Sequence, residues 1–357
     1  MKQKTTNTPQ NAGDTEETQM TSLLNALPGS ISQGLIWGIM AIGVYITYRL
    51  LDVADLTVDG SFCTGGAMCA VTLANGKDWL GALFGAETVD AWASAFNLNI
   101  VILIMAVLFA LLAGLLAGFC TGILHTACGI PAILAGILTQ LGLWSVNLVT
   151  IMGKKATISI AVGKMDLLVA MRYITDVEKG KRWFIQHPIF VAGLFTIAII
   201  GILYWFFGTE LGSSIRATGA NRAMARAQGI NTNKNTVLGL MISNGLVALS
   251  GALLAQYQGF AEINMGRGAI VIGLAAVIIG EVVFGKLFRN FGLKLLAVSI
   301  GAVIYYIVIQ AVISLSGIDS NYLKLLTAMI VAVFLAVPYW KGKYFSKPVK
   351  RGGNANA

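Results

Sequence analysis

Long apolar stretches alternate with short polar segments along most of this chain. A helix that crosses a membrane needs roughly 20 mostly apolar residues, and about nine stretches approach that length. The pattern predicts an all-α polytopic membrane protein with about nine transmembrane helices, within a range of eight to ten. The stretches cover residues 31–48, 58–74, 100–121, 130–152, 189–207, 236–257, 269–284, 295–315 and 323–339.

The second and seventh stretches are short and rich in glycine, which predicts broken helices near residues 56–66 and 266–280. Short, interrupted spans in both halves of a transporter typically line the substrate path. Close helix packing explains the same glycines equally well, so both interpretations stay open. In the third stretch, Gly114, Gly118 and Gly122 recur at four-residue spacing, which favours the packing interpretation.

Polar segments flank the apolar region. Residues 1–30 are predicted to be a polar tail with a short interfacial helix at 20–27, which Pro28 and Gly29 would end. Residues 31–340 would form the transmembrane domain, and residues 341–357 a basic tail. The first part of the chain is nearly free of apolar side chains, so no cleavable signal peptide is expected.

Positive charge in the loops predicts the orientation. The loop 208–235, the turn 285–294 and the C-terminal tail are basic and are separated by even numbers of spans, so they would share the cytoplasmic side. The segment 153–187 is also basic but falls on the opposite side in this topology. The three consistent segments outweigh it. They predict a multi-pass protein of the cell (plasma or inner) membrane with a cytoplasmic C-terminus.

Composition supports a membrane protein, since 56% of the residues are apolar and 11% are charged. Soluble domains contain about 25% charged residues. The net charge of +9 comes from clusters between apolar stretches, as in membrane-protein loops, so no nucleic-acid partner is expected. Cys120, His125 and Cys128 lie close in sequence but lack a fourth ligand, so no metal site is expected.

The loop 208–235 contains a short predicted helix. Asn221 is suited to cap a helix by accepting from exposed backbone N–H groups. Residues 222–228 are mostly helix formers, and Gly229 can adopt the left-handed conformation that ends a helix. The prediction is a helix of two turns, roughly 10 Å long.

Two functions fit this short helix. Arg222 and Arg226 would share one face, and Ala223 and Ala227 would form a second, smooth face. A small-faced helix on the membrane surface is suited to docking in a groove of another protein. A basic helix is equally suited to resting on anionic lipid, and the residues alone leave both functions open.

The segment RATGANRAMARAQGIN resembles the cytoplasmic loop of ABC importer permeases of the branched-chain amino acid and ribose type. The likeness extends to NGLVALSGALLAQYQG, to GLIWGIMAIGVYITYRLLDVADLTVDGSF and to GAIVIGLAAVIIGE, where Glu281 stands at the family's second glycine. It covers most of residues 31–339 and is greatest for the branch that works with tryptophan- or tyrosine-type binding lipoproteins. The loop residues that match are Ala217, Gly219, Asn221, Ala223, Ala227, Gly229, Ile230 and Asn231.

The resemblance implies a dimeric permease, expected to be a homodimer, with an ABC ATPase subunit on the cytoplasmic side and an extracytoplasmic substrate-binding lipoprotein. The chain has no G-x-x-x-x-G-K-[ST] phosphate loop. It would therefore hold no cofactor and be no enzyme, and ATP and magnesium would bind to the partner ATPase. The coupling residues implied by the resemblance are Gly219, Asn221, Arg222, Ala223, Arg226, Ala227 and Gly229.

Polar residues inside spans are candidates for a substrate path, because a charge in a span is costly and is commonly functional. Asp59 would neutralise the ammonium of an amino acid, with the hydroxyls of Thr57 and Ser61 beside it. The alternative is that Asp59, together with Asp52 and Asp55, is solvated at the membrane surface.

Three further polar residues belong to the candidate path. Gln140 and Trp144 would share a helix face, and Asn244 lies inside a later span. Hydrogen bonding between helices explains such amides as often as ligand contact does. Glu210 and Glu281 are expected to pair with basic groups near the inner surface.

The leading prediction is the membrane subunit of an ATP-driven importer that works by alternating access. Its substrate would be a small polar solute, expected from the resemblance to be an amino acid and, more narrowly, an aromatic one. The alternative is a stand-alone secondary transporter or channel, which would need ion-coupling carboxylates deep in the spans, and few exist besides Asp59. An intramembrane enzyme is disfavoured because the chain has no H-E-x-x-H motif and only two histidines.

Overall fold

The computed structural model describes residues 10–85, 98–160, 167–180, 186–285 and 287–316, and a few positions between 325 and 336. The helices are α1 (Gln10–Tyr45), α2 (Val58–Phe84), α4 (Leu98–Thr126), α5 (Ala132–Val146), α6 (Arg172–Glu178), α7 (Pro188–Gly208), α8 (Glu210–Ala220), α9 (Arg222–Ala227), α10 (Thr232–Gln258), α11 (Ala269–Phe284) and α12 (Phe291–Ser316). The π-helical turns η1 (Ile46–Leu50) and η2 (Asn147–Ile151) extend α1 and α5. Strands β1 (Thr157–Ser159) and β2 (Phe260–Glu262) pair antiparallel, with Ile158 opposite Ala261.

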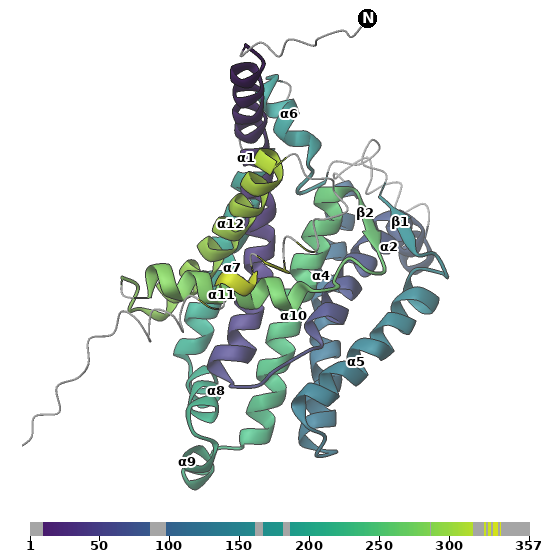
Figure 1. Cartoon of the computed structure of the whole chain (residues 1–357). Coiled ribbons are helices and arrows are strands. Elements are labelled where there is room, and N and C mark those ends of the chain that lie inside the picture. Colours follow the sequence, from purple (N-terminus) through teal and green to yellow (C-terminus); the bar gives the residue numbers. More distant parts are fainter. Residues whose placement is uncertain are drawn as a thin grey trace, which may run out of the picture.

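The bundle is built around α10, against which α1, α2 and α4 pack (Figure 1). The helix is buried along most of its length from Ser243 to Tyr257. The short α6 and the two strands lie at one end of the bundle, which we call the α6 end. The helices α8 and α9 lie at the other end, called here the α9 end (Figure 1).

Six of the described helices are long and apolar enough to cross a membrane, so the chain is a polytopic α-helical membrane protein. The helix α2 has 27 residues but is not among the six, and α11 has only 16 residues. The stretch 323–339 lies almost entirely outside the described residues. The prediction of about nine spans is therefore not confirmed. The six spans are Leu23–Leu50, Leu98–Thr126, Ala132–Val149, Pro188–Gly208, Thr232–Gln258 and Phe291–Ser314.

The ends of the bundle agree with part of the predicted topology. The elements β1 and α6, which come from the basic segment 153–187, lie opposite the loop that carries α9 (Figure 1). The helix α1 begins at the α6 end. The basic tail 341–357 lies outside the described residues.

The first helix corrects a prediction. We expected a tail, a short helix at 20–27 and a break at Pro28, but α1 is continuous from Gln10 to Tyr45 with Pro28 inside it. Residues 1–9 lie outside the described part of the chain. The Ser32 hydroxyl donates to the Pro28 carbonyl (2.8 Å), and the Tyr257 hydroxyl donates to the Gly29 carbonyl (3.2 Å). Contacts with α10 thus hold the helix together despite a proline penalty of about 3 kcal/mol.

The two predicted helix breaks are also displaced. The helix α2 runs without a break from Val58, and α11 from Ala269, so the glycines lie inside continuous helices. The non-helical segments come before them, at 52–57 and 263–268. A Cβ on Gly65 would collide with the Ala248 carbonyl of α10, and one on Gly280 with the Ala297 carbonyl of α12. These glycines therefore allow close helix packing.

Alanine at Gly65 tests this packing. The added methyl group has no room against the α10 backbone, so we expect Gly65→Ala to destabilise the protein by about 1–3 kcal/mol. The measurement is the thermal unfolding midpoint in detergent. Gly201→Ala in α7 is the matched control, because nothing lies within 4 Å of its added Cβ. A Gly65→Ala protein as stable as the Gly201→Ala protein would contradict the packing role.

Candidate functional site

The short helix α9 forms as the sequence predicts. Its N-cap is Asn221, whose side-chain oxygen accepts from the Met224 backbone N–H at 3.0 Å. The helix ends at Ala227, one residue before the predicted end. Gly229 follows with φ 79°, the left-handed conformation that terminates a helix without strain.

Most of α9 faces away from the bundle. Arg222, Ala223 and Ala227 are exposed, and so is Met224, which the sequence analysis did not single out. Ala225 is buried and anchors the helix. The Arg226 guanidinium donates from Nε to the Thr232 hydroxyl at 2.9 Å, so this exposed arginine is tied to the first residue of α10.

Gly219 lies on the inner side of this loop, in α8. A Cβ there would collide with the Leu50 carbonyl of η1, so the glycine lets α8 contact the end of the first span. The Asn235 amide of α10 donates to the Thr218 hydroxyl at 3.1 Å. The loop is therefore fixed to both the first span and α10.

Three of the predicted path residues belong to a buried hydrogen-bond network. Asn244 donates to the Asp55 carboxylate (2.6 Å) and accepts from the Ser61 hydroxyl (2.6 Å). The hydroxyls of Thr57 and Thr121 lie 2.7 Å apart. The alternative interpretation of the sequence, in which Asp55 is solvated at the membrane surface, is wrong for this residue, because Asp55 is buried in the turn before α2.

Asp55 also holds that turn. Its carboxylate accepts from the Thr57 backbone N–H at 2.9 Å. Burial raises the pKa of the Asp55 carboxyl above its usual value, and hydrogen bonds from Thr57 and Asn244 oppose that rise.

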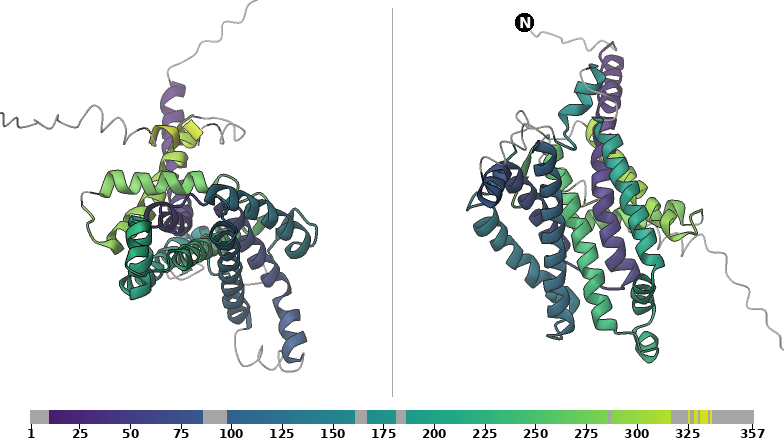
Figure 2. Two further views of the ribbon diagram at one scale, coloured as in Figure 1. Left: turned by 90° about the horizontal axis from the view of Figure 1, so that it is seen from below. Right: turned by 180° about the vertical axis from the view of Figure 1, so that it is seen from behind.

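Asp59 caps the helix α11 from the first turn of α2. Its two carboxylate oxygens accept from the backbone N–H groups of Gly268 and Ile270, each at 3.0 Å. The carboxylate of this half-buried residue therefore has two backbone partners. Helix α11 lies across the direction of α1 and α10 (Figure 2), so this contact positions a transverse helix.

A small cavity lies between α2, α5 and the segment that follows β2. Its volume is about 180 Å³. Three predicted path residues line it, namely Asp59, Gln140 and Trp144. The remaining lining residues are Gly60, Cys63, Leu141, Asn147, Ile263 and Arg267. The structure thus divides the predicted path into this cavity and the Asp55 network, and it adds Asn147 and Arg267, which the sequence analysis missed.

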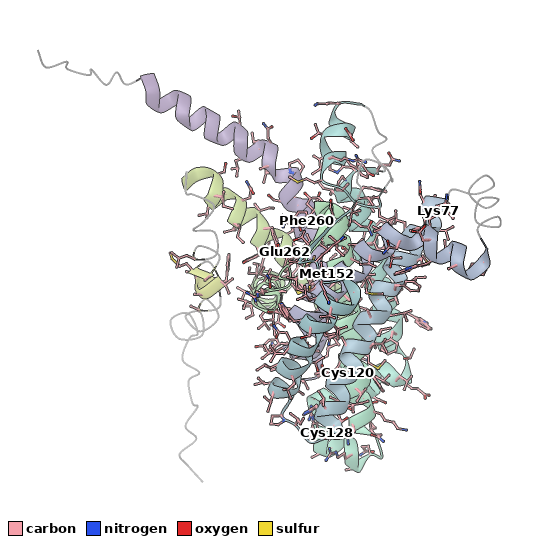
Figure 3. All side chains as sticks on the ribbon, turned by 90° about the vertical axis from the view of Figure 1, so that its right-hand side faces the viewer. Lys77, Cys120, Cys128, Met152, Phe260 and Glu262 are labelled. Atoms are coloured by element: carbon pink, nitrogen blue, oxygen red, sulfur yellow. The ribbon has the colours of Figure 1, made fainter. Side chains whose placement is uncertain are left out.

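Apolar side chains and the β1–β2 pair lie on the α6 side of this cavity. Ala67, Met152 and Ile263 form a buried cluster, and Ile263 also lines the cavity. Met152 and Glu262 lie near each other toward the α6 end, and Cys128 lies toward the α9 end (Figure 3). The cavity therefore borders a buried apolar cluster at Ile263.

An ion pair joins the first span to α11. Arg49 Nε in η1 lies 2.8 Å from Glu281 Oε1, as predicted for Glu281. The corresponding prediction for Glu210 stays a prediction, since Glu210 forms no ion pair within the described residues. Glu210 instead lies in the first turn of α8, where negative charge is stabilised by the helix dipole.

Comparison with known proteins defines the family. A membrane bundle with a capped surface helix at one end is an architecture suited to a transport subunit. The family model described as "Branched-chain amino acid transport system / permease component" matches residues 27–337. The chain belongs to this family of ABC importer permeases, as the loop motif predicted.

Several relatives carry transport names. A "Tyrosine transport system permease protein" of Clostridioides difficile is 37% identical over 306 residues, covering 86% of this chain and 89% of the relative. The "Uncharacterized protein RP368" of Rickettsia prowazekii is 33% identical, covering 88% and 98%. The "Ribose import permease protein RbsC" of Escherichia coli is 25% identical, covering 44% and 47%. No solved structure matches the chain.

The Asp55 network gives a stability prediction. Asn244→Leu removes the donor to the Asp55 Oδ2 atom and the acceptor of the Ser61 hydroxyl, both buried, so we expect a loss of about 1–3 kcal/mol in unfolding free energy. Ser243→Ala is the control, because it removes one hydroxyl that donates to a backbone carbonyl, that of Gly43. Unfolding in detergent measures both, and equal losses would show that Asn244 contributes only an ordinary hydrogen bond.

Proposed function

We propose that the chain is the membrane subunit of an ATP-driven importer of an amino acid, with an aromatic amino acid as the first candidate substrate. The observation that carries the ATP-driven step is the capped, outward-facing helix α9 in a chain of the ABC permease family. The tyrosine transport permease from C. difficile supports the substrate class. The proposed partners are an ABC ATPase with its ATP and magnesium, a substrate-binding lipoprotein and a second copy of this chain.

In this proposal α9 docks in a groove of the ATPase on the cytoplasmic side. Its exposed residues Arg222, Ala223, Met224 and Ala227 would make the contact, while Arg226 keeps the helix attached to α10. The C-terminal tail would lie on the same side. Gly219 acts inside the protein, at the contact with the first span.

Two contacts would carry movement of α9 into the bundle. The first is the contact of α8 with Leu50, since the chain continues from there into the turn that Asp55 holds and then into α2. The second is the ion pair of Arg49 with Glu281, which joins the same end of the first span to α11. Because the N-terminus of α11 is bonded to Asp59, movement of α8 would reach the cavity from two sides.

The stand-alone secondary transporter or channel is the alternative. It requires carboxylates that are free to bind a coupling ion. Asp55 is buried and bonded to Thr57 and Asn244, and the half-buried Asp59 caps α11, so the described spans offer few such carboxylates. We therefore favour the ATP-driven importer.

Charge reversal on α9 tests ATPase docking. We expect Arg222→Glu to lower the amount of ATPase that co-purifies with the co-expressed permease at least about tenfold, or about 1.4 kcal/mol of binding free energy. Arg289→Glu is the matched control, because Arg289 is also exposed but lies outside the α8–α9 loop. If both variants retain the ATPase equally, docking through Arg222 is wrong. If the unchanged permease retains no ATPase, or if uptake follows an ion gradient after ATP depletion, the ATP-driven importer is wrong.

A charge exchange tests the link through α11. Arg49→Glu and Glu281→Arg each place like charges at the ion pair, so we expect each to lower uptake severalfold while the ATPase still co-purifies. The double variant restores opposite charges and should recover most of the uptake. Uptake is measured in proteoliposomes that contain the complete transporter. No recovery in the double variant would mean that the pair does not act as a link.

A further inference from the structure

A buried carboxamide without partners lies in the cavity between α2 and α5. The Asn147 side chain has no exposed surface, and neither its Oδ1 nor its Nδ2 has a hydrogen-bond partner in the described structure. The Cys63 thiol is close enough to interact with the Asn147 side chain, but it donates its S–H to the Ile263 carbonyl (3.1 Å), and sulfur is only a weak acceptor. An unsatisfied buried polar group costs about 1–3 kcal/mol, so the position is best explained by a ligand that supplies the missing partners.

Groups of both charges line the same cavity. Each carboxylate oxygen of Asp59 accepts one hydrogen bond from the backbone of α11 and can accept at least one more. The Arg267 guanidinium is exposed, lines the cavity, and forms no ion pair with any described residue, Asp59 included. The cavity therefore offers a cation and an anion that do not neutralise each other by direct contact.

The rest of the lining is apolar or aromatic. Leu141, Trp144 and Ile263 contribute this part, and the Trp144 ring is 44% exposed. The volume of about 180 Å³ lies below the 300–1,000 Å³ of pockets for drug-sized ligands. The cavity thus suits one small molecule with two opposite charges and an apolar group.

We propose that this cavity binds the zwitterionic head of a free amino acid. Arg267 and the Asn147 Nδ2 group bind the carboxylate, while Asp59 and the Asn147 Oδ1 atom bind the ammonium. The amino acid side chain lies against Trp144. The choice of an amino acid rests on the proposed function, whereas the demand for two opposite charges rests on the cavity itself.

Saturation-transfer NMR on the purified full-length permease tests the site with L-tyrosine as the probe. Tyramine lacks the carboxylate, 3-(4-hydroxyphenyl)propanoate lacks the ammonium, and D-ribose has no charge. We expect L-tyrosine to bind at least about tenfold more tightly than each of these, since each lost charge pair weakens binding by about that factor. Equal binding of tyramine or of ribose would overturn the zwitterion site.

Substitutions locate the binding. Asn147→Leu is nearly isosteric and removes an unsatisfied group, so it should abolish L-tyrosine binding without lowering the unfolding midpoint. Arg267→Gln, at an exposed position, should weaken L-tyrosine about tenfold and leave tyramine unchanged. Gln310→Leu, in the separate cavity beside α1 and α6, is the control. L-Tyrosine binding that survives Asn147→Leu and Arg267→Gln would refute the site.

The same preparations separate this proposal from the proposed function. The ATPase should co-purify with Asn147→Leu as well as with the unchanged protein, because the cavity lies away from α9. One outcome is that Asn147→Leu loses L-tyrosine binding but no form of the permease retains an ATPase. This outcome would refute the ATP-driven importer and support the binding site. The opposite outcome is that the ATPase is retained and Asn147→Leu still binds L-tyrosine. It would support the ATP-driven importer and refute the binding site.

Discussion

Two helices begin inside the protein, and the need to satisfy their first backbone N–H groups shapes the centre of the bundle. Within a bilayer, irregular backbone is tolerated only where protein or cavity water satisfies it. Asp55 accepts from the turn before α2, and Asp59 accepts from the first turn of α11. The two costly carboxylates near the second span thus both hold backbone, and Asp59 also lines a cavity.

The same constraint explains which features the sequence predicts well. The spans in α4, α7 and α10 follow from apolar length, and α9 follows from the local chemistry of Asn221 and Gly229. These signals act over a few residues, so they can be identified in one sequence. The sequence predicts that Glu281 pairs with a basic group, because a charge at the membrane boundary needs a partner. It does not identify Arg49 as that group, because Arg49 lies 232 residues away.

Other features depend on contacts that no local pattern encodes. Pro28 normally ends a helix, yet α1 continues through it, and the Tyr257 hydroxyl of α10 donates to the carbonyl of the next residue, Gly29. Asp59 reaches Gly268 across 209 residues, so its capping role could not be read from the run Thr57 to Ser61. Gly65, in the segment predicted to break α2, instead fits against α10. Sequence alone could not decide between these roles, because close packing and helix interruption both require the absence of a side chain.

The capping contact also gives the cavity its electrostatic character. The position of Asp59 meets two demands. The first turn of α11 needs an acceptor for its backbone N–H groups, and a charged carboxylate within the bundle needs donors that offset the cost of its burial. Asp59 satisfies both demands, since the N–H groups of Gly268 and Ile270 stabilise its charge and leave further lone pairs for a ligand. These donors belong to α11, and Arg49 at the end of the first span is paired with Glu281 of α11. A shift of the first span would therefore move α11 and, with it, the donors that stabilise the Asp59 charge. In the proposed importer, a movement at the α9 end would therefore alter affinity in the cavity without any direct contact between them.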